Sequence, residues 1–163
     1  MYNIDEDFYA KHGVTTLLVD LDNTLDPYVV KDPSPETLAW KKRMDEAHIR
    51  VVILSNNSGT RVHRYAEGLG VECRCFMKKP FSGPLKKFLA EEKLPKESVL
   101  LVGDQIMTDV KAGNGAGVRV ILTEPLNTKK EPPWTRFNRL FDRPIRKKIK
   151  AKGLAKDFKE VNP

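Results

Sequence analysis

The chain of 163 residues carries 29 Lys and Arg against 22 Asp and Glu, a net charge of +7, and 40% of its residues are hydrophobic. This length is typical of one domain with a substantial core. The sequence contains no run of 18 apolar residues, and its acidic N-terminus lacks an apolar h-region, so we expect neither a transmembrane helix nor a signal or transit peptide.

Short apolar runs alternate with helical patterns along the chain. Strands are predicted at residues 16–19, 51–54, 71–75, 99–102 and 118–122. Helices are predicted from Ser34-Pro35 to about 47, through 62–69 up to Gly70, over 84–93 and over 108–115. This alternation predicts an α/β fold in which right-handed crossovers join a five-stranded parallel sheet.

Two acids, Asp20 and Asp22, follow the first predicted strand. Side chains at i and i+2 of a strand share a face, and open α/β sheets bind ligands beyond the carboxyl ends of their strands. The pair is typical of a nucleophile and an acid/base that share a divalent metal. An ordinary turn rich in Asp and Asn is the alternative interpretation.

The later strand ends favour the chemical interpretation. Ser55-Asn56-Asn57 follows the second strand, Lys78-Lys79-Pro80 comes next, and Gly103-Asp104 ends the fourth strand, with Asp109 five residues beyond Asp104. Phosphoryl transfer through an aspartyl intermediate needs a carboxylate nucleophile, a proton donor, Mg²⁺ and donors for the phosphate oxygens. The strand ends supply groups for each of these roles.

The ordered motifs DLDNTL, SNN, KKP and GDQIMTD resemble those of the haloacid-dehalogenase-like (HAD) phosphatase superfamily. They are most similar to subfamily IIIA, which includes phosphatidylglycerophosphate phosphatases. The resemblance implies a Rossmann-like sheet with strand order 5-4-1-2-3. We expect a HAD-like core over residues 1–126 and a basic helical extension over 127–163, packed on or near that core.

The resemblance also implies residue roles. Asp20 would attack phosphorus, and Asp22 would act as general acid and base. Lys79 would neutralise charge on the nucleophile and on the phosphoryl group, a role for which Lys78 is the weaker candidate. Mg²⁺ would be held by Asp20, the main-chain carbonyl of Asp22, and Asp104, with Asp109 orienting these ligands. The residues expected at the substrate phosphate are Thr24, Ser55 and Asn56.

The motif spacing leaves no room for a separate cap domain. Thirty-five positions separate Asp20 from Ser55, and 24 separate Ser55 from Lys79, and each interval is filled by a helix and a strand. A lid commonly gives small-molecule phosphatases specificity and excludes water. A site without one fits a bulky substrate, such as a lipid head group, a phosphoprotein or a nucleic-acid end.

The C-terminal segment is strongly basic. Residues 136–152 hold eight Lys and Arg and one acid, Asp142. The net charge of this segment, +7, equals that of the whole protein. Apolar residues interleave at near-helical spacing, and we expect Pro144 to break the run. Such a segment is typical of a membrane-surface element that binds anionic lipid. The alternatives are a helix that docks through its apolar residues with its charges in solvent, and, less favoured, a nucleic-acid surface.

Cys73 and Cys75 are the only two cysteines of the chain. A metal site would need more ligands nearby, and a disulfide between positions this close would be strained, so we expect a structural role for both. The histidines at 12, 48 and 63 show no ligand spacing.

Three functions remain open. The first is a Mg²⁺-dependent phosphatase of phospholipid metabolism that acts on phosphatidylglycerophosphate or a similar substrate, in a cytoplasmic protein located peripherally at the inner face of the membrane. The second is a capless phosphatase with a cytosolic phosphoprotein, nucleic-acid end or soluble ester as substrate. The third is a non-catalytic binding module, which would not need Asp20 and Asp22 together.

Overall fold

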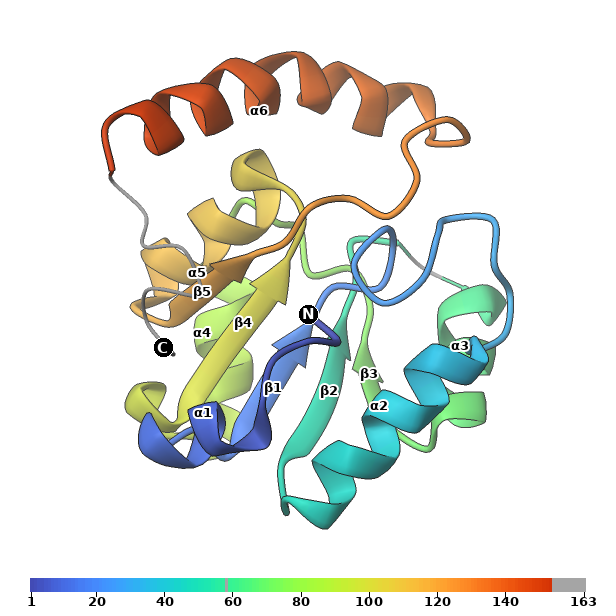
Figure 1. The fold of residues 1–163 in the computed structure, drawn as a ribbon, viewed down its shortest axis with the longest axis vertical. Coiled ribbons are helices and arrows are strands. Elements are labelled where there is room, and N and C mark those ends of the chain that lie inside the picture. Colours follow the sequence, from blue (N-terminus) through green and yellow to red (C-terminus); the bar gives the residue numbers. More distant parts are fainter. Residues whose placement is uncertain (58, 154–163) are drawn as a thin grey trace.

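A computed structural model of the chain describes residues 1–57 and 59–153. Its centre is a five-stranded parallel sheet in the order β3-β2-β1-β4-β5 (Figure 1). The strands are β1 (Thr16–Val19), β2 (Arg50–Leu54), β3 (Glu72–Arg74), β4 (Val99–Gly103) and β5 (Arg119–Leu122). The predicted fold class and strand order are therefore confirmed, and Asp20 directly follows the central strand.

Helices cover both faces of the sheet. Leu17 and Val19 of β1 face a cluster with α1 (Glu6–Lys11), α2 (Pro35–Glu46) and α3 (Thr60–Leu69). Leu18 faces the opposite cluster, with α4 (Gly83–Glu91) and α5 (Lys111–Ala116). Because successive strand side chains alternate between faces, an apolar four-residue strand supplies core to both layers.

Local signals place the helix ends. The Ser34 hydroxyl accepts a hydrogen bond from the Thr37 amide at 3.2 Å, and Pro35 occupies the first helical position, so α2 begins where the sequence predicts. Gly70 ends α3 in the left-handed region. The sequence analysis did not predict α1, which begins after Asp5, a cap for the Asp7 amide.

The predicted helix over 108–115 begins earlier than expected. A short 3₁₀ turn, η1 (Lys96–Ser98), precedes β4, and a π-helical turn, η2 (Ile106–Val110), lies between β4 and α5. The amides of Ile106 and Met107 donate to Asp142, which lies on the C-terminal helix. A distant carboxylate therefore satisfies the first amides of this turn, and the local sequence pattern does not reveal it.

The C-terminal helix α6 (Pro133–Ala151) lies across the carboxyl ends of the strands (Figure 1). The expected break at Pro144 is wrong, because α6 continues through it. Residues 154–163 of the predicted extension lie outside the described residues. In the described part of the chain, no element stands between β1 and α2 or between β3 and α4, and no helix is long and apolar enough to cross a membrane.

The packing of α5 on the sheet provides a stability test. A Cβ at Gly113 would lie 2.3 Å from Val120 Cγ2 and 3.0 Å from Leu101 Cδ2, whereas a Cβ at Gly83 meets nothing within 4 Å. We expect Gly113→Ala to lower the free energy of unfolding by about 1–3 kcal/mol through overpacking. Gly83→Ala, the matched control, should be neutral or raise it by up to about 1 kcal/mol. Urea unfolding measures both, and equal effects would contradict this packing.

Candidate active site

A pocket of ≈ 150 Å³ lies at the carboxyl ends of the strands, between the loops that follow them and α6. It collects most of the residues that the sequence analysis singled out. Those lining it are Asp20, Asp22, Ser55, Asn56 and Lys79, together with Tyr28, Thr108, Glu131, Trp134, Thr135 and Asn138. The groups therefore meet in space although nearly sixty residues separate Asp20 from Lys79 in the chain.

The ammonium of Lys79 lies at the floor of this pocket. It donates to Asp20 Oδ1 at 2.6 Å, to Asp109 Oδ1 at 2.7 Å and to the Leu54 carbonyl at 2.9 Å. These three acceptors use all the donors of an ammonium group. Lys79, and not Lys78, thus brings its charge to Asp20.

Asn56 fixes the backbone of Lys79. Its side-chain amide donates to the Lys79 carbonyl at 2.8 Å, and its side-chain oxygen accepts from the Lys79 amide at 2.7 Å. The sequence analysis placed Asn56 only at the substrate phosphate, so this positioning contact was missed. Nearby, the buried Ser55 hydroxyl accepts from the Asn57 amide at 3.1 Å.

The charged groups on the pocket floor lie close enough to shift one another's pKa values. Burial raises the pKa of Asp20 well above its usual range; Lys79 opposes this rise, and the carboxylates of Asp109 and Asp104 reinforce it. Burial alone would lower the pKa of Lys79, but Asp109 and Asp20 outweigh burial and raise it. The floor therefore carries more negative charge than Lys79 alone compensates.

Asp22 lies nearer the pocket mouth. Its Oδ1 accepts from Arg61 at 2.6 Å and its Oδ2 from the side-chain amide of Asn57 at 2.7 Å. A residue of α3 and a residue of the loop before it thus orient this carboxylate. Arg61 also donates to the Val30 carbonyl. The sequence analysis did not single out Arg61, since one arginine at the start of a helix gives no recognisable signal.

Asp104 is fully buried between two donors. Thr24 Oγ1 contacts its Oδ1 at 3.4 Å, and Arg139 of α6 donates to its Oδ2 and, at 3.0 Å, to its carbonyl. Burial raises the pKa of Asp104 to about 6 despite the neighbouring Arg139. Arg139 thus occupies one side of the carboxylate that the resemblance assigns to the metal.

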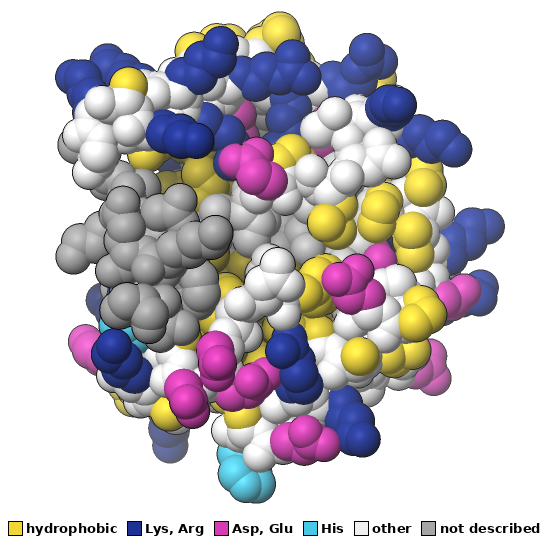
Figure 2. All heavy atoms as spheres, viewed as in Figure 1, with side chains coloured by type: hydrophobic (Ala, Val, Ile, Leu, Met, Phe, Trp, Pro, Cys, Tyr) yellow, Lys and Arg dark blue, Asp and Glu magenta, His cyan; other side chains and the backbone are white. Residues whose placement is uncertain are grey.

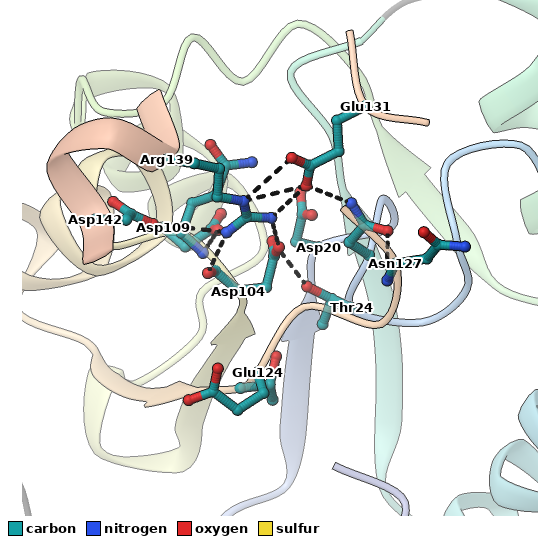
Figure 3. A network of polar contacts seen from close by, with 12 residues as sticks. Asp20, Thr24, Asp104, Asp109, Glu124, Asn127, Glu131, Arg139 and Asp142 are labelled. Atoms are coloured by element: carbon teal, nitrogen blue, oxygen red, sulfur yellow. Dashed lines mark hydrogen bonds and ion pairs between the residues drawn. The ribbon is translucent and has the colours of Figure 1, made fainter. Parts of the chain in front are cut away.

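Arg139 is the centre of a buried polar network (Figure 3). Its guanidinium donates to both oxygens of Glu131, with the shortest of these contacts at 2.7 Å. Glu131 also accepts from the Asn23 side chain at 2.6 Å. Since Asn23 lies within the first motif, this network links the loop that follows β1 to α6.

Two further residues of α6 bind the loop that follows β4. Asp142 accepts from the Ile106 and Met107 amides, both at 3.1 Å, and Arg146 donates to the carbonyls of Asp104 and Thr123. The sequence analysis counted these arginines as surface charge. The spacing of Arg139, Asp142 and Arg146 at i, i+3 and i+7 was the available signal for one polar docking face.

The carboxylates suit a hard divalent cation. Oxygen atoms of Asp20, Asp104 and Asp109 lie within 4.8 Å of one another. Mg²⁺ prefers such oxygen ligands, and its charge would offset the carboxylates that Lys79 and Arg139 leave partly uncompensated. Asp109 is already engaged by Lys79 and by the Gln105 amide. It packs against Gly103, where a Cβ would lie 2.4 Å from the Asp109 carboxyl carbon.

Comparison with known proteins shows the family of the chain. A family model described as HAD-hydrolase-like matches residues 76–132. The chain is 33% identical over 153 residues to the probable phosphatase YqeG of Bacillus subtilis (strain 168), an alignment that covers 94% of this chain and 88% of that protein. The chain belongs to the HAD-like phosphatases. This HAD-like phosphatase is also 27% identical, over 161 residues, to phosphatidylglycerophosphate phosphatase 1, chloroplastic/mitochondrial, of Arabidopsis thaliana, and spans 46% of that protein.

Solved structures share the fold of this HAD-like phosphatase. One is the 3-deoxy-D-manno-octulosonate 8-phosphate phosphatase of Moraxella catarrhalis in complex with magnesium, phosphate and KDO (TM-score 0.55, 18% identity, 70% of this chain and 71% of that chain). Another is the cobalt-bound phosphatase YrbI of Haemophilus influenzae (TM-score 0.56, 14% identity, 78% and 75%). At these identities the likeness concerns the fold alone.

The pKa of Asp104 leads to a prediction for metal-free protein. A carboxyl group with a pKa of about 6 when folded and near 3.8 when unfolded binds its proton more tightly in the folded state. Its contribution to stability therefore falls as pH rises from about 4 to about 6 and is constant above that range. Urea unfolding in EDTA should show wild type losing about 2 kcal/mol relative to Asp104→Asn between pH 4.5 and 6.5. A wild type that gains stability relative to the variant would contradict this assignment.

Proposed function

We propose that this HAD-like phosphatase hydrolyses phosphomonoesters with Mg²⁺ and that Asp20 forms a phospho-aspartate. The observation that carries the proposal is the contact between the Asp20 carboxylate and the Lys79 ammonium at 2.6 Å on the floor of an open pocket. A buried carboxylate held beside a cation is oriented for attack, and the cation remains to neutralise the incoming phosphoryl group.

Each proposed step uses a residue of the pocket. Asp20 attacks phosphorus while the ester oxygen leaves with a proton from Asp22. Asp22 then removes a proton from water, which attacks the phospho-aspartate, releases phosphate and regenerates Asp20. Ser55 and the Asn56 amide would hold phosphate oxygens, and Thr24 would fix the loop beside Asp104. The contacts of Asp22 with Arg61 and Asn57 hold its carboxylate at the mouth, where a leaving group would lie.

Asp20 and Asp104, with the main-chain carbonyl of Asp22, would hold Mg²⁺, which would screen the negative charge of the transferring phosphoryl group. Arg139 donates to only one carboxylate oxygen of Asp104, and the other carboxylate oxygen has a single long contact with Thr24. Asp104 would therefore keep its bond to α6 while offering its free oxygen. Asp109 would hold Lys79 in place.

The size of the pocket favours a substrate that extends beyond it. A volume of ≈ 150 Å³ suits a phosphoryl group, while pockets that enclose drug-sized ligands span about 300–1,000 Å³. The leaving group would therefore lie along the rim, where Tyr28 and Trp134 stand. The name of the Arabidopsis relative points to phosphatidylglycerophosphate, whose lipid chains would remain outside the pocket.

The outward face of α6 supports a membrane-interfacial substrate. Its docking face is polar, through Arg139 and Asp142, which are buried, whereas its large apolar residues point outward. These exposed residues are Trp134, Phe137, Leu140 and Phe141. Lys and Arg side chains gather beside them along α6 (Figure 2). Exposed aromatics between basic residues, next to the pocket mouth, are typical of a surface that binds anionic lipid. The burial of Arg139 and Asp142 favours this interpretation over docking of α6 through its apolar residues, the alternative that the sequence left open.

The proposed chemistry is tested with Asp20→Asn, which keeps the shape of the side chain and removes the anionic nucleophile. Phosphate release from phosphatidylglycerophosphate and from an aryl phosphate should fall by at least about 10³-fold, and EDTA should abolish the wild-type activity. The matched control is Asp32→Asn, because Asp32 is an exposed partner of Arg64. Undiminished activity in Asp20→Asn would refute the nucleophile.

Membrane binding is tested with a triple charge reversal on α6, in which Lys147, Lys148 and Lys150 are changed to Glu; all three are exposed. Co-sedimentation with anionic vesicles at low salt should weaken at least about 100-fold, since each basic residue contributes about 1 kcal/mol near such a surface. The matched control reverses three exposed lysines around α4 (Lys86, Lys87 and Lys93) and changes the net charge equally.

Equal losses in the two vesicle variants would mean that only net charge matters. A wild type that ignores anionic vesicles at low salt would contradict the membrane proposal and favour a soluble or macromolecular substrate. Binding should also weaken as salt rises, because the attraction is screened over about 10 Å at 0.1 M.

A further inference from the structure

Both cysteines of the chain meet a histidine at the edge of the sheet. Cys73 lies in β3, the edge strand, Cys75 follows that strand, and His63 projects from α3. Cys73 Sγ lies 3.4 Å from His63 Nδ1, and Cys75 Sγ lies 3.7 Å from His63 Nε2. The spacing along the chain gave no sign of this, because α3 returns His63 to the strand only in the folded protein.

The two sulfur atoms lie about as far from the His63 ring as the ligands of one tetrahedral zinc ion lie from one another, although each faces a different ring nitrogen. With Zn–S near 2.3 Å and Zn–N near 2.0 Å, the sulfur and nitrogen ligands of one ion lie about 3.6 Å apart, and two sulfur ligands about 3.8 Å apart. One ligand atom from each of the three residues lies within 4.8 Å of the others. His63 is exposed, so its ring can turn to direct one nitrogen at the ion.

We propose that His63, Cys73 and Cys75 form a second metal site, which takes Zn²⁺ or a similar thiophilic dication. Two thiolates and a neutral imidazole would leave the site without net charge around the ion. Only these three ligands belong to the cluster among the described residues, so water or a small thiol would occupy the fourth position.

This site is chemically distinct from the carboxylate cluster. Its sulfur and imidazole ligands favour zinc, whereas the oxygen atoms of Asp20, Asp104 and Asp109 favour Mg²⁺. The inference therefore does not rest on the proposed phosphatase mechanism. Each site can be removed by substitution while the other remains.

The site lies at the start of the segment that leads to Lys79. Phe76, which directly follows Cys75, and Lys78 both have positive φ values, 54° and 50°. Such conformations cost free energy in residues other than glycine, so the segment benefits from an anchor at each end. Asn56 anchors Lys79 at one end, and a metal at Cys75 would anchor the other.

Metal binding should depend on pH. Cysteine binds a metal as the thiolate, whereas an ordinary thiol is mostly protonated at neutral pH. Binding must therefore displace protons from sulfur, and affinity for the metal should increase as pH rises through neutrality.

The test is a titration of the full-length protein with Co²⁺, with the thiols kept reduced by a phosphine. Wild type should bind one equivalent with a sulfur-to-cobalt charge-transfer band in the near ultraviolet and the visible bands of a tetrahedral ion. Zn²⁺ should displace the cobalt and raise the melting temperature. Cys73→Ser and Cys75→Ser should each abolish the charge-transfer band, and His63→Gln should weaken binding and shift the visible bands.

Asp104→Asn is the control, since it alters the carboxylate cluster and should keep the thiolate–cobalt band. A wild type without that band, or a band that survives in Cys73→Ser, would overturn the second site. Loss of the band in Asp104→Asn would also overturn it, because cobalt binding at the thiolates would then depend on the carboxylate cluster. Exposed His63 can be changed without disturbing the core, so His63→Gln keeps the test decisive if a cysteine variant fails to fold.

Discussion

The structure depends on positive charge that compensates the buried carboxylates at one end of the sheet. Asp20, Asp104 and Asp109 lie together with little access to water, an arrangement that is unstable unless positive charge is brought to it. Lys79 supplies that charge from the segment after β3, and Arg139 supplies it from α6. The two cations reach the same cluster from parts of the chain sixty residues apart. The packing of both parts against the sheet therefore depends on the negative charge of the site.

This constraint explains the unusual orientation of α6. A helix that packs on a core normally buries its apolar stripe, whereas α6 buries Arg139 and Asp142 and leaves Trp134 and Phe137 in solvent. The ion pairs orient the helix, and its aromatic and basic residues then face outward beside the pocket. The contacts that complete the site thus also create the surface proposed to meet the membrane. Within the described residues, where no cap domain stands over the pocket, the helix covers one side of it.

Much of the fold was predictable from local patterns. The apolar runs, the Ser34 cap and Gly70 placed β-strands and helices correctly, and the parallel topology brought Asp20, Ser55 and Lys79 to one pocket. The contacts of Arg139 and Asp142 were not predictable in this way, because they join side chains to loops thirty or more residues away. A count of charge cannot distinguish a buried arginine from a solvated one.

The coupling between Arg139 and Asp104 is the most direct test of this account. A double-mutant cycle would compare wild type, Arg139→Met, Asp104→Asn and the double variant by urea unfolding in EDTA at pH 7. Each single variant breaks this ion pair and leaves the remaining charge with fewer partners, so the double variant should be more stable than the sum of the two losses implies, by about 1–3 kcal/mol. Losses that add within about 0.5 kcal/mol would contradict the claim that α6 is held by charge compensation at the site.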